Sequence, residues 1–350
     1  MAGAKKADAS RGVRFANASD AATRAPKPLY GGQAVMEGVM MRGPRFMAVA
    51  MRDPRGKIVL HSEALSPIYT SPWAKVPFLR GLLLLWDALG LGSRVLGLSA
   101  NVQAESEEEK IEGAPLVITM LISFSFAIGL FFLLPAGLGH LAERYLALSP
   151  LAGNLLEGLI RLMTLLGYLW AVGRMDEIRR VFGYHGAEHK TIHAYEAGVK
   201  LTPKNVARFP LEHPRCGTAF LLSVIVLSIL VFTLIGPLPL LQRLLLRVLL
   251  IPVLAGIAYE YLRWTASNIR NPIVRLLVAP NLALQRLTTR PPDVKMLEVS
   301  IAAFSEMHKL ETSKAPKPKA LVIKPPKKKT AKKTTKRTTS ARTKKLPRKN

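Results

Sequence analysis

The sequence predicts a mainly α-helical, polytopic membrane bundle of about four spans, with a small N-terminal β-hairpin and additional interfacial helices. Three observations support this fold class. Hydrophobic residues make up 49% of the 350 residues although the formal net charge is +27, so apolar and charged residues must be segregated along the chain. Several apolar runs reach the roughly 20 residues that a helix needs to cross a bilayer. Near the N-terminus, two short apolar stretches flank a Pro- and Gly-containing turn, which is typical of a hairpin.

Four apolar segments qualify as membrane spans, and two of them carry no charged residue. The four are 115–138, 151–172, 218–235 and 238–262. In the second, Glu157 and Arg161 are four residues apart and so share a helix face. Since lone charges facing lipid are costly, we interpret these two residues as a structural ion pair in preference to a transport site.

A further apolar stretch, 78–98, is harder to assign. It contains Arg80, Asp87, Arg94 and several glycines, so a helix here would carry a polar strip. We interpret it as an interfacial or re-entrant helix. A fifth crossing would place the N-terminal region outside the cell.

The distribution of basic residues predicts the orientation. Lys and Arg are frequent before residue 94, in the connection 174–217 and in the C-terminal tail, whereas the connection 139–150 has only Arg144 as a strong base. By the positive-inside rule, both termini and the His-rich connection face the cytosol. The predicted location is therefore the bacterial inner membrane.

The chain divides by composition into six regions. In order, they are a disordered basic N-terminus (1–28), an N-terminal motif with the hairpin (29–75), the 78–98 helix with an acidic linker (76–110), the transmembrane bundle (111–265), a cytosolic amphipathic region (266–311) and a disordered polybasic tail (312–350). The predicted hairpin strands are 46–52 and 57–63.

The connection 174–217 contains the residues best suited to chemistry. If 184–195 is helical, His185 and His189 share one face, and His193 follows one turn later. Two imidazoles at this spacing can bind one zinc ion. With Glu188, the order is His-x-x-Glu-His, the inverted zincin pattern, in which the glutamate is the general base.

A third metal ligand is needed, and the sequence leaves its identity open. The candidates are His193, Glu196, His213, Cys216 and Glu260. His213 and Cys216 have close ligand spacing. Cys216 could equally be a nucleophile or a small buried residue, and Glu260 could be an interfacial anchor. The alternatives to a metal centre are a hydrogen-bonded His/Glu/Tyr network that fixes a cytosolic helix to the bundle, and a proton or substrate relay.

Four separate motifs, in order, resemble the YqhQ family of bacterial membrane proteins. They lie at 31–44, 185–193, 213–218 and 287–293, and the resemblance runs from about Leu29 to Phe304. It implies a membrane protein with a His/Cys site and metal-dependent chemistry, but it supplies no reaction. It also implies that Glu37 and Arg42 close the site from the N-terminal side.

The tail 312–350 contains sixteen Lys and Arg and no acidic residue. Lacking the large apolar residues that form a core, its Lys-rich part is predicted to be disordered. A polyanion must be its partner: anionic lipid headgroups, or RNA such as that of the ribosome. The single cysteine of the chain excludes an intramolecular disulfide, and the sequence leaves the oligomeric state open.

The sequence therefore favours an integral inner-membrane protein with a cytosol-facing divalent-metal site, and zinc is the best-fitting ion. If the protein is an enzyme, it is predicted to be a metal-dependent hydrolase of unknown substrate; a structural metal site is the other interpretation of the same residues. The catalytic residue would be Glu188, the ligands would come from His185, His189, His193, His213 and Cys216, and the supporting carboxylates would be Glu37, Glu196 and Glu260. The alternative is a non-enzymatic scaffold or insertion-related factor that contacts ribosomes or anionic lipid through its tail. A transporter ranks third, since no inverted repeat is evident.

Overall fold

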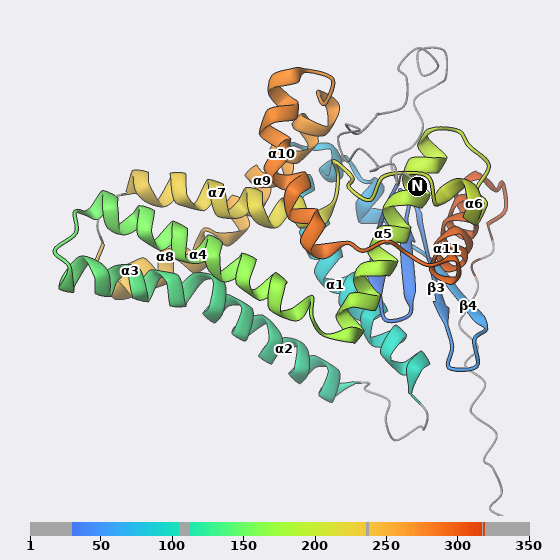
Figure 1. The fold of residues 1–350 in the computed structure, drawn as a ribbon, viewed down its shortest axis with the longest axis horizontal. Helices are drawn as coiled ribbons and strands as arrows, with labels where there is room; N and C mark the ends of the chain where they lie inside the picture. Colours follow the sequence, from blue (N-terminus) through green and yellow to red (C-terminus); the bar gives the residue numbers. More distant parts are fainter. Residues whose placement is uncertain (1–29, 105–112, 236–237, 317, 319–350) are drawn as a thin grey trace, which may run out of the picture.

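The computed structural model describes residues 30–104, 113–235, 238–316 and 318. The predictions for 1–28, for most of the acidic linker and for nearly all of the tail lie outside the described residues. In Figure 1, long helices run together on one side of the molecule, and a β-sheet flanked by helices lies at the other end.

The sheet comes first in the chain and the helices follow. The strands are β1 Gly31–Val35, β2 Gly38–Arg42, β3 Phe46–Arg52 and β4 Ile58–Ala64. Two short 3-10 helices, η1 Pro67–Thr70 and η2 Pro72–Lys75, lead into the α-helices. These are α1 Leu79–Gln103, α2 Ala114–Ile128, α3 Leu134–Tyr145, α4 Pro150–Val172, α5 Asp176–Glu196, α6 Pro203–Val206, α7 Gly217–Ile235, α8 Leu240–Leu249, α9 Ile251–Ser267, α10 Pro272–Thr288 and α11 Val294–Thr312; a π-helical turn, η4 Gly129–Leu133, joins α2 to α3.

The sheet is an antiparallel meander in the order β1-β2-β3-β4. The predicted hairpin is confirmed as β3–β4, with Phe46 opposite Ala64 and Arg52 opposite Ile58. The hairpin β1–β2 was not predicted, because its glycines and methionines are not typical strand residues. Its turn places Glu37 at a positive φ of 51°.

Strand β3 reads as an unbroken apolar run because both of its faces are buried. Ala48 and Ala50 pack into one core with residues of α5 and α11. Met47 and Val49 point the other way and pack against α1. The sheet therefore forms the middle layer between α5 with α11 on one face and α1 on the other.

Within the described ranges, four helical stretches are long and apolar enough to cross a membrane, or five if one bent pair counts as a span. Three of the predicted spans are among them: α2 to α3 as one continuous stretch, α4 and α7. The fourth, 238–262, is instead the bent pair α8 and α9, with a 45° bend at the break between them. Pro252 lies in the first turn of α9, where it cannot donate the hydrogen bond that would continue α8.

The stretch predicted as interfacial or re-entrant is α1, one unbroken helix of 25 residues. It lacks the turn that a re-entrant loop needs, and it is itself among the four stretches long and apolar enough to span. Its glycines have a packing role: a Cβ at Gly81 would lie 3.0 Å from the Cβ of Tyr259 in α9. Small residues let α1 approach its neighbours closely, which offsets their poor helix propensity.

Buried charges join the apolar helices. Glu157 of α4 binds Arg161 at 2.7 Å and Arg247 of α8 at 2.8 Å, and all three side chains are at most 3% exposed. Arg161 also donates to the hydroxyl of Ser228 in α7 at 2.7 Å. The predicted pair is thus part of a larger network that connects α4, α7 and α8.

Candidate metal centre

Helix α5 carries His185, Glu188, His189 and His193 between the sheet and the ends of the apolar helices. Two acidic residues occupy its first turn, which suits the positive end of the helix dipole. Gly198 follows its end with φ 71°, the left-handed conformation that commonly terminates a helix. Tyr184–Tyr195 is helical as predicted.

Three ligand atoms, one each from His185, His189 and Cys216, lie within 4.8 Å of one another. We call these three residues the inner group. The Nε2 atom of His185 is 3.2 Å from the sulfur of Cys216, and the imidazole rings of His185 and His189 are 4.4 Å apart between centroids. Two of the three residues come from one helix face and the third from the residue just before α7.

Each of the three histidines of α5 has one ring nitrogen bonded to a backbone carbonyl. His185 Nδ1 lies 2.9 Å from the oxygen of Thr288, and His189 Nδ1 lies 2.5 Å from the oxygen of Leu211. His193 Nε2 lies 2.9 Å from the oxygen of Glu212. A nitrogen that donates to a carbonyl fixes the tautomer and leaves the other nitrogen with a lone pair, which is the usual arrangement of metal-binding histidines.

A second set, the outer group, consists of His193, Glu196 and His213, whose ligand atoms also lie within 4.8 Å of one another. The rings of His193 and His213 are 4.6 Å apart, and that of His213 is 5.6 Å from His189 of the inner group. Glu196 also forms an ion pair with Arg215, so this carboxylate is engaged and the outer group is the weaker candidate for a metal.

Glu188 is 5% exposed, and its Oε2 atom has no hydrogen-bond partner among the residues that the structure describes. Burial raises the pKa of Glu188 to about 8; His185 opposes this rise and Cys216 adds to it. A buried carboxyl oxygen that lacks a partner is costly. It therefore indicates a ligand or a functional role for the side chain.

Gly32 of β1 provides the space for Glu188. A Cβ at this position would lie 2.6 Å from the backbone oxygen of Met40 and 2.9 Å from Glu188 Cδ. Gly186 of α5 provides space for a different neighbour, the backbone of Arg290, because a Cβ at Gly186 would lie 2.3 Å from the Arg290 oxygen. These two glycines let the sheet and the segment after α10 close on the site.

The pKa values favour ligand-competent forms. Burial lowers the pKa of His189 below its ordinary value, and it lowers that of His213 to about 4. Burial alone would raise the pKa of the Cys216 thiol, but the nearby His189 and Thr218 outweigh it, so the pKa is below its ordinary value. Metal ligands must be neutral imidazole and thiolate, and two imidazoles with one thiolate suit zinc. The inner group therefore fits a divalent metal.

The remaining predicted residues lie apart from these two groups. Glu260 accepts hydrogen bonds from Arg80 and from the backbone nitrogen of Phe78 at 3.0 Å, which ties α9 to the start of α1. Glu37 is bound to Arg180 at 2.5 Å and to the hydroxyl of Tyr184 at 3.2 Å. It fixes the β1–β2 turn to α5, one turn before the inner group.

Other contributors were not predicted from sequence. Gln285 of α10 bonds both backbone groups of His213, accepting from its nitrogen at 2.8 Å and donating to its oxygen at 2.9 Å. The backbone carbonyls of Leu211 and Thr288 cannot be recognised from the sequence, because any residue type supplies a carbonyl. Gly32 could have been recognised, since a Gly-Gly pair at the start of a strand indicates close backbone approach.

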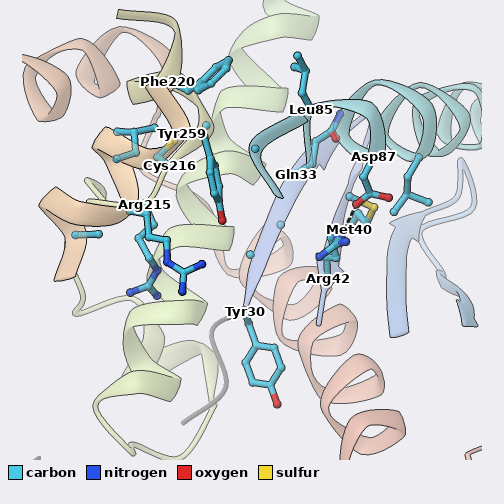
Figure 2. A pocket seen from close by; sticks show the side chains of 18 of the residues that line it. Tyr30, Gln33, Met40, Arg42, Leu85, Asp87, Arg215, Cys216, Phe220 and Tyr259 are labelled. Atoms are coloured by element: carbon cyan, nitrogen blue, oxygen red, sulfur yellow. Dashed lines mark hydrogen bonds and ion pairs between the residues drawn. The ribbon is translucent and has the colours of Figure 1, made fainter. Parts of the chain in front are cut away.

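A cavity of about 620 Å³ opens beside the inner group (Figure 2). Cys216 is on its wall, together with Gly31 and Gly32 of β1 and residues of α1, α7 and α9. The hydroxyl of Tyr259 points into it, between Arg215 on one side and Gln33 on the other. Of the inner group, Cys216 is the member that lines this cavity, which is large enough for a substrate.

The fold and the site define a mainly helical protein with candidate membrane spans and a His/His/Cys group, two of whose three residues are buried, at their junction with a small sheet. Residues 76–310 match the family described as protein of unknown function (DUF1385). The chain is 36% identical over 303 residues to the uncharacterized protein YqhQ of Bacillus subtilis (strain 168), covering 81% of this chain and 93% of that protein. The chain belongs to this family, as the motifs suggested. No solved structure matches it.

Proposed function

We propose that this protein is a metal-dependent hydrolase of the bacterial inner membrane, with its centre and both termini on the cytosolic side. The observation that carries the proposal is the buried side chain of Glu188, whose Oε2 atom has no hydrogen-bond partner within the described chain and which interacts electrostatically with His185 and Cys216 of the inner group. The excess of basic residues in 174–217 supports the orientation.

In this proposal His185, His189 and Cys216 hold the ion, and zinc suits their chemistry best. A bound divalent ion supplies Lewis acidity, which lowers the pKa of water and polarises a substrate oxygen. The carbonyls of Thr288 and Leu211 hold the two imidazoles in place.

Glu188 accepts the proton of the attacking water, and a nearby cation favours its ionised form. The tight walls around it limit water: Gly32 lies against its side chain on one side, and Tyr184 and His189 beside it on α5 are both 1% exposed. His193 and Glu196 from the end of α5, and His213 from the loop before α7, support the centre in this proposal.

Metal analysis of the purified full chain tests this proposal, with hydrolysis of nitrophenyl ester and phosphoester probes as the second readout. Wild type should hold about one equivalent of zinc, and His189→Ala should lose it. Glu188→Gln should keep the metal and lose hydrolysis, because it removes the base but no ligand. Glu177→Gln, the same substitution at an exposed position of the same helix, is the matched control and should keep both. Metal-free wild type rejects the centre, and an active Glu188→Gln rejects the base.

A second function is favoured by one observation on the sequence, the sixteen basic residues of 312–350. In this alternative the chain is a membrane scaffold or insertion-related factor, and the tail holds ribosomes or anionic lipid electrostatically. Ribosome co-sedimentation of the full chain and of a chain ending at residue 311 separates the two partners, since only ribosome binding produces co-pelleting in detergent.

A further inference from the structure

The cavity next to Cys216 is lined by two kinds of residue, apolar and charged. Helices α1, α7 and α9, which belong to candidate spans, contribute the apolar residues Leu85, Leu91, Phe220 and Leu262. The charged residues of the lining come from β2 (Arg42), from the loop before α7 (Arg215), and from α1 and α9 themselves (Asp87 and Arg263). A cavity that combines apolar residues with several charged ones matches an amphipathic ligand.

The charged lining residues are mostly cationic. Arg42, Arg215 and Arg263 line the cavity together with the carboxylate of Asp87; Arg42 is paired with Asp87, and Arg215 with Glu196 outside the lining. Arg42 and Arg215 lie on opposite sides of the cavity (Figure 2). Three guanidinium groups around one space are the arrangement expected for a phosphate or carboxylate, because arginine binds such groups through paired N–H donors.

Arg42 offers a specific donor. Its Nε binds Asp87 at 2.5 Å, but its Nη2 is buried and has no partner among the described residues. A buried, unsatisfied guanidinium nitrogen carries a desolvation cost that an anionic ligand would remove. Arg42 lines the cavity, and its guanidinium carbon lies 5.0 Å from the centre of the Tyr69 ring, so a side-chain rotation would bring this donor to an anion in the cavity.

Two exposed tryptophans lie on helices that line the cavity. Trp86 of α1 is 74% exposed and Trp264 of α9 is 51% exposed, and both helices line the cavity. Tryptophan is enriched where membrane meets water. On α10, which follows α9, Leu276 is 74% exposed and Ile273 68%, as in helices that lie on a bilayer. A ligand could therefore enter from the lipid.

We propose that the cavity binds a membrane lipid with a phosphate headgroup, and that this lipid is the substrate of the centre. The phosphate lies between Arg42, Arg215 and Arg263, and the acyl chains lie along Leu85 and Phe220. The role as substrate rests on the proposed hydrolase, whereas lipid binding does not. Hydrolysis would add water across one ester bond: the hydroxyl goes to the acyl carbon or the phosphorus, and the proton goes to the leaving oxygen.

Binding of dioctanoyl phosphatidic acid to the purified full chain in detergent tests the proposal, with tryptophan fluorescence as the readout. It should bind at least ten-fold more tightly than dioctanoylglycerol, dioctanoyl phosphatidylcholine or inorganic phosphate. Equal affinity for the glycerol or choline lipid overturns the anionic site. Equal affinity for inorganic phosphate overturns the lipid assignment.

Two exposed arginines provide a matched pair of variants. Arg263→Gln removes a lining cation and should weaken binding of phosphatidic acid about five-fold or more, whereas Arg275→Gln, on α10 and not part of the lining, should not. Leu85→Glu places a carboxylate in the apolar wall and should abolish binding. Equal affinities in all three variants and wild type overturn the site; thermal midpoints show that each variant folds.

Repeating the titration after chelation, and with His189→Ala, separates this proposal from the metal centre. Retained lipid binding without metal leaves the cavity assignment standing even if the hydrolase proposal fails. A chain that holds zinc but shows no preference for phosphatidic acid leaves the centre standing and overturns the lipid substrate.

Discussion

Replacing Gly32 by alanine tests whether β1 really forms the wall against Glu188. The new Cβ would lie 2.6 Å from the backbone oxygen of Met40, and 2.9 and 3.0 Å from Cδ and Cγ of Glu188. Contacts below 3 Å force neighbours to move, and overpacking of this kind costs about 1–3 kcal/mol. At about 2–4 °C per kcal/mol for a chain of this size, the thermal midpoint should fall by about 2–12 °C.

The adjacent glycine is the matched control. Gly31 is exposed and a Cβ there meets nothing within 4 Å, so Gly31→Ala should leave the midpoint within about 1 °C of wild type. Differential scanning fluorimetry of both variants in the same detergent measures the difference. Equal midpoints for the two variants would refute the proposed packing of α5 against β1.

A double-mutant cycle identifies Glu188 as the clashing side chain. Two of the three close atoms belong to Glu188, so Glu188→Ala should recover part of the loss caused by Gly32→Ala, with a coupling of at least about 0.5 kcal/mol. The contact with Met40 remains, so recovery should be incomplete. Strict additivity would place Glu188 away from β1.

Three other predictions follow from the charges. Glu157→Gln leaves two buried arginines without their shared carboxylate and should destabilise the bundle by about 3–5 kcal/mol, measured by thermal unfolding, whereas Glu143→Gln, whose side chain is 16% exposed, should cost less. The hydrogen bond from Arg180 holds the pKa of Glu37 below its ordinary value, so the ion pair stabilises the fold at neutral pH and this stabilisation is lost as the pH falls through the lowered pKa. Glu37→Gln should therefore lower the free energy of unfolding by up to about 1 kcal/mol at pH 7 and leave it unchanged in acid. A difference between variant and wild type that does not depend on pH would contradict this. Removing 312–350 should abolish ribosome co-pelleting at low salt, and unchanged pelleting would reject the tail as the tether.

Much of the helical part could be predicted because its signals are local. Runs such as 218–235 are apolar over their whole length, which is enough to recognise α7. His185 and His189 could be placed on one face because four residues make about one helical turn. The β3–β4 hairpin was recognisable from its turn.

The rest depended on contacts between distant segments. The role of α11 as a layer over the sheet was not predictable, because its buried face complements Ala48 and Ala50, more than 240 residues away. The strands β1 and β2 were missed because Gly32 and Gly38 serve close packing instead of strand propensity. The contacts between α5 and the loop before α7 are of the same kind. Cys216 lies against His185, and Arg215 forms an ion pair with Glu196; both contacts follow from how this loop folds over α5.

The central claim is that His185, His189 and Cys216 together hold one divalent ion, and cobalt substitution tests it most directly. The absorption spectrum of the cobalt-loaded full chain should show thiolate-to-cobalt charge transfer and the intense visible bands of a four-coordinate ion. Cys216→Ser should remove the charge-transfer band while His193→Ala keeps it. A cobalt spectrum without sulfur character, or one that Cys216→Ser leaves unchanged, would contradict the account.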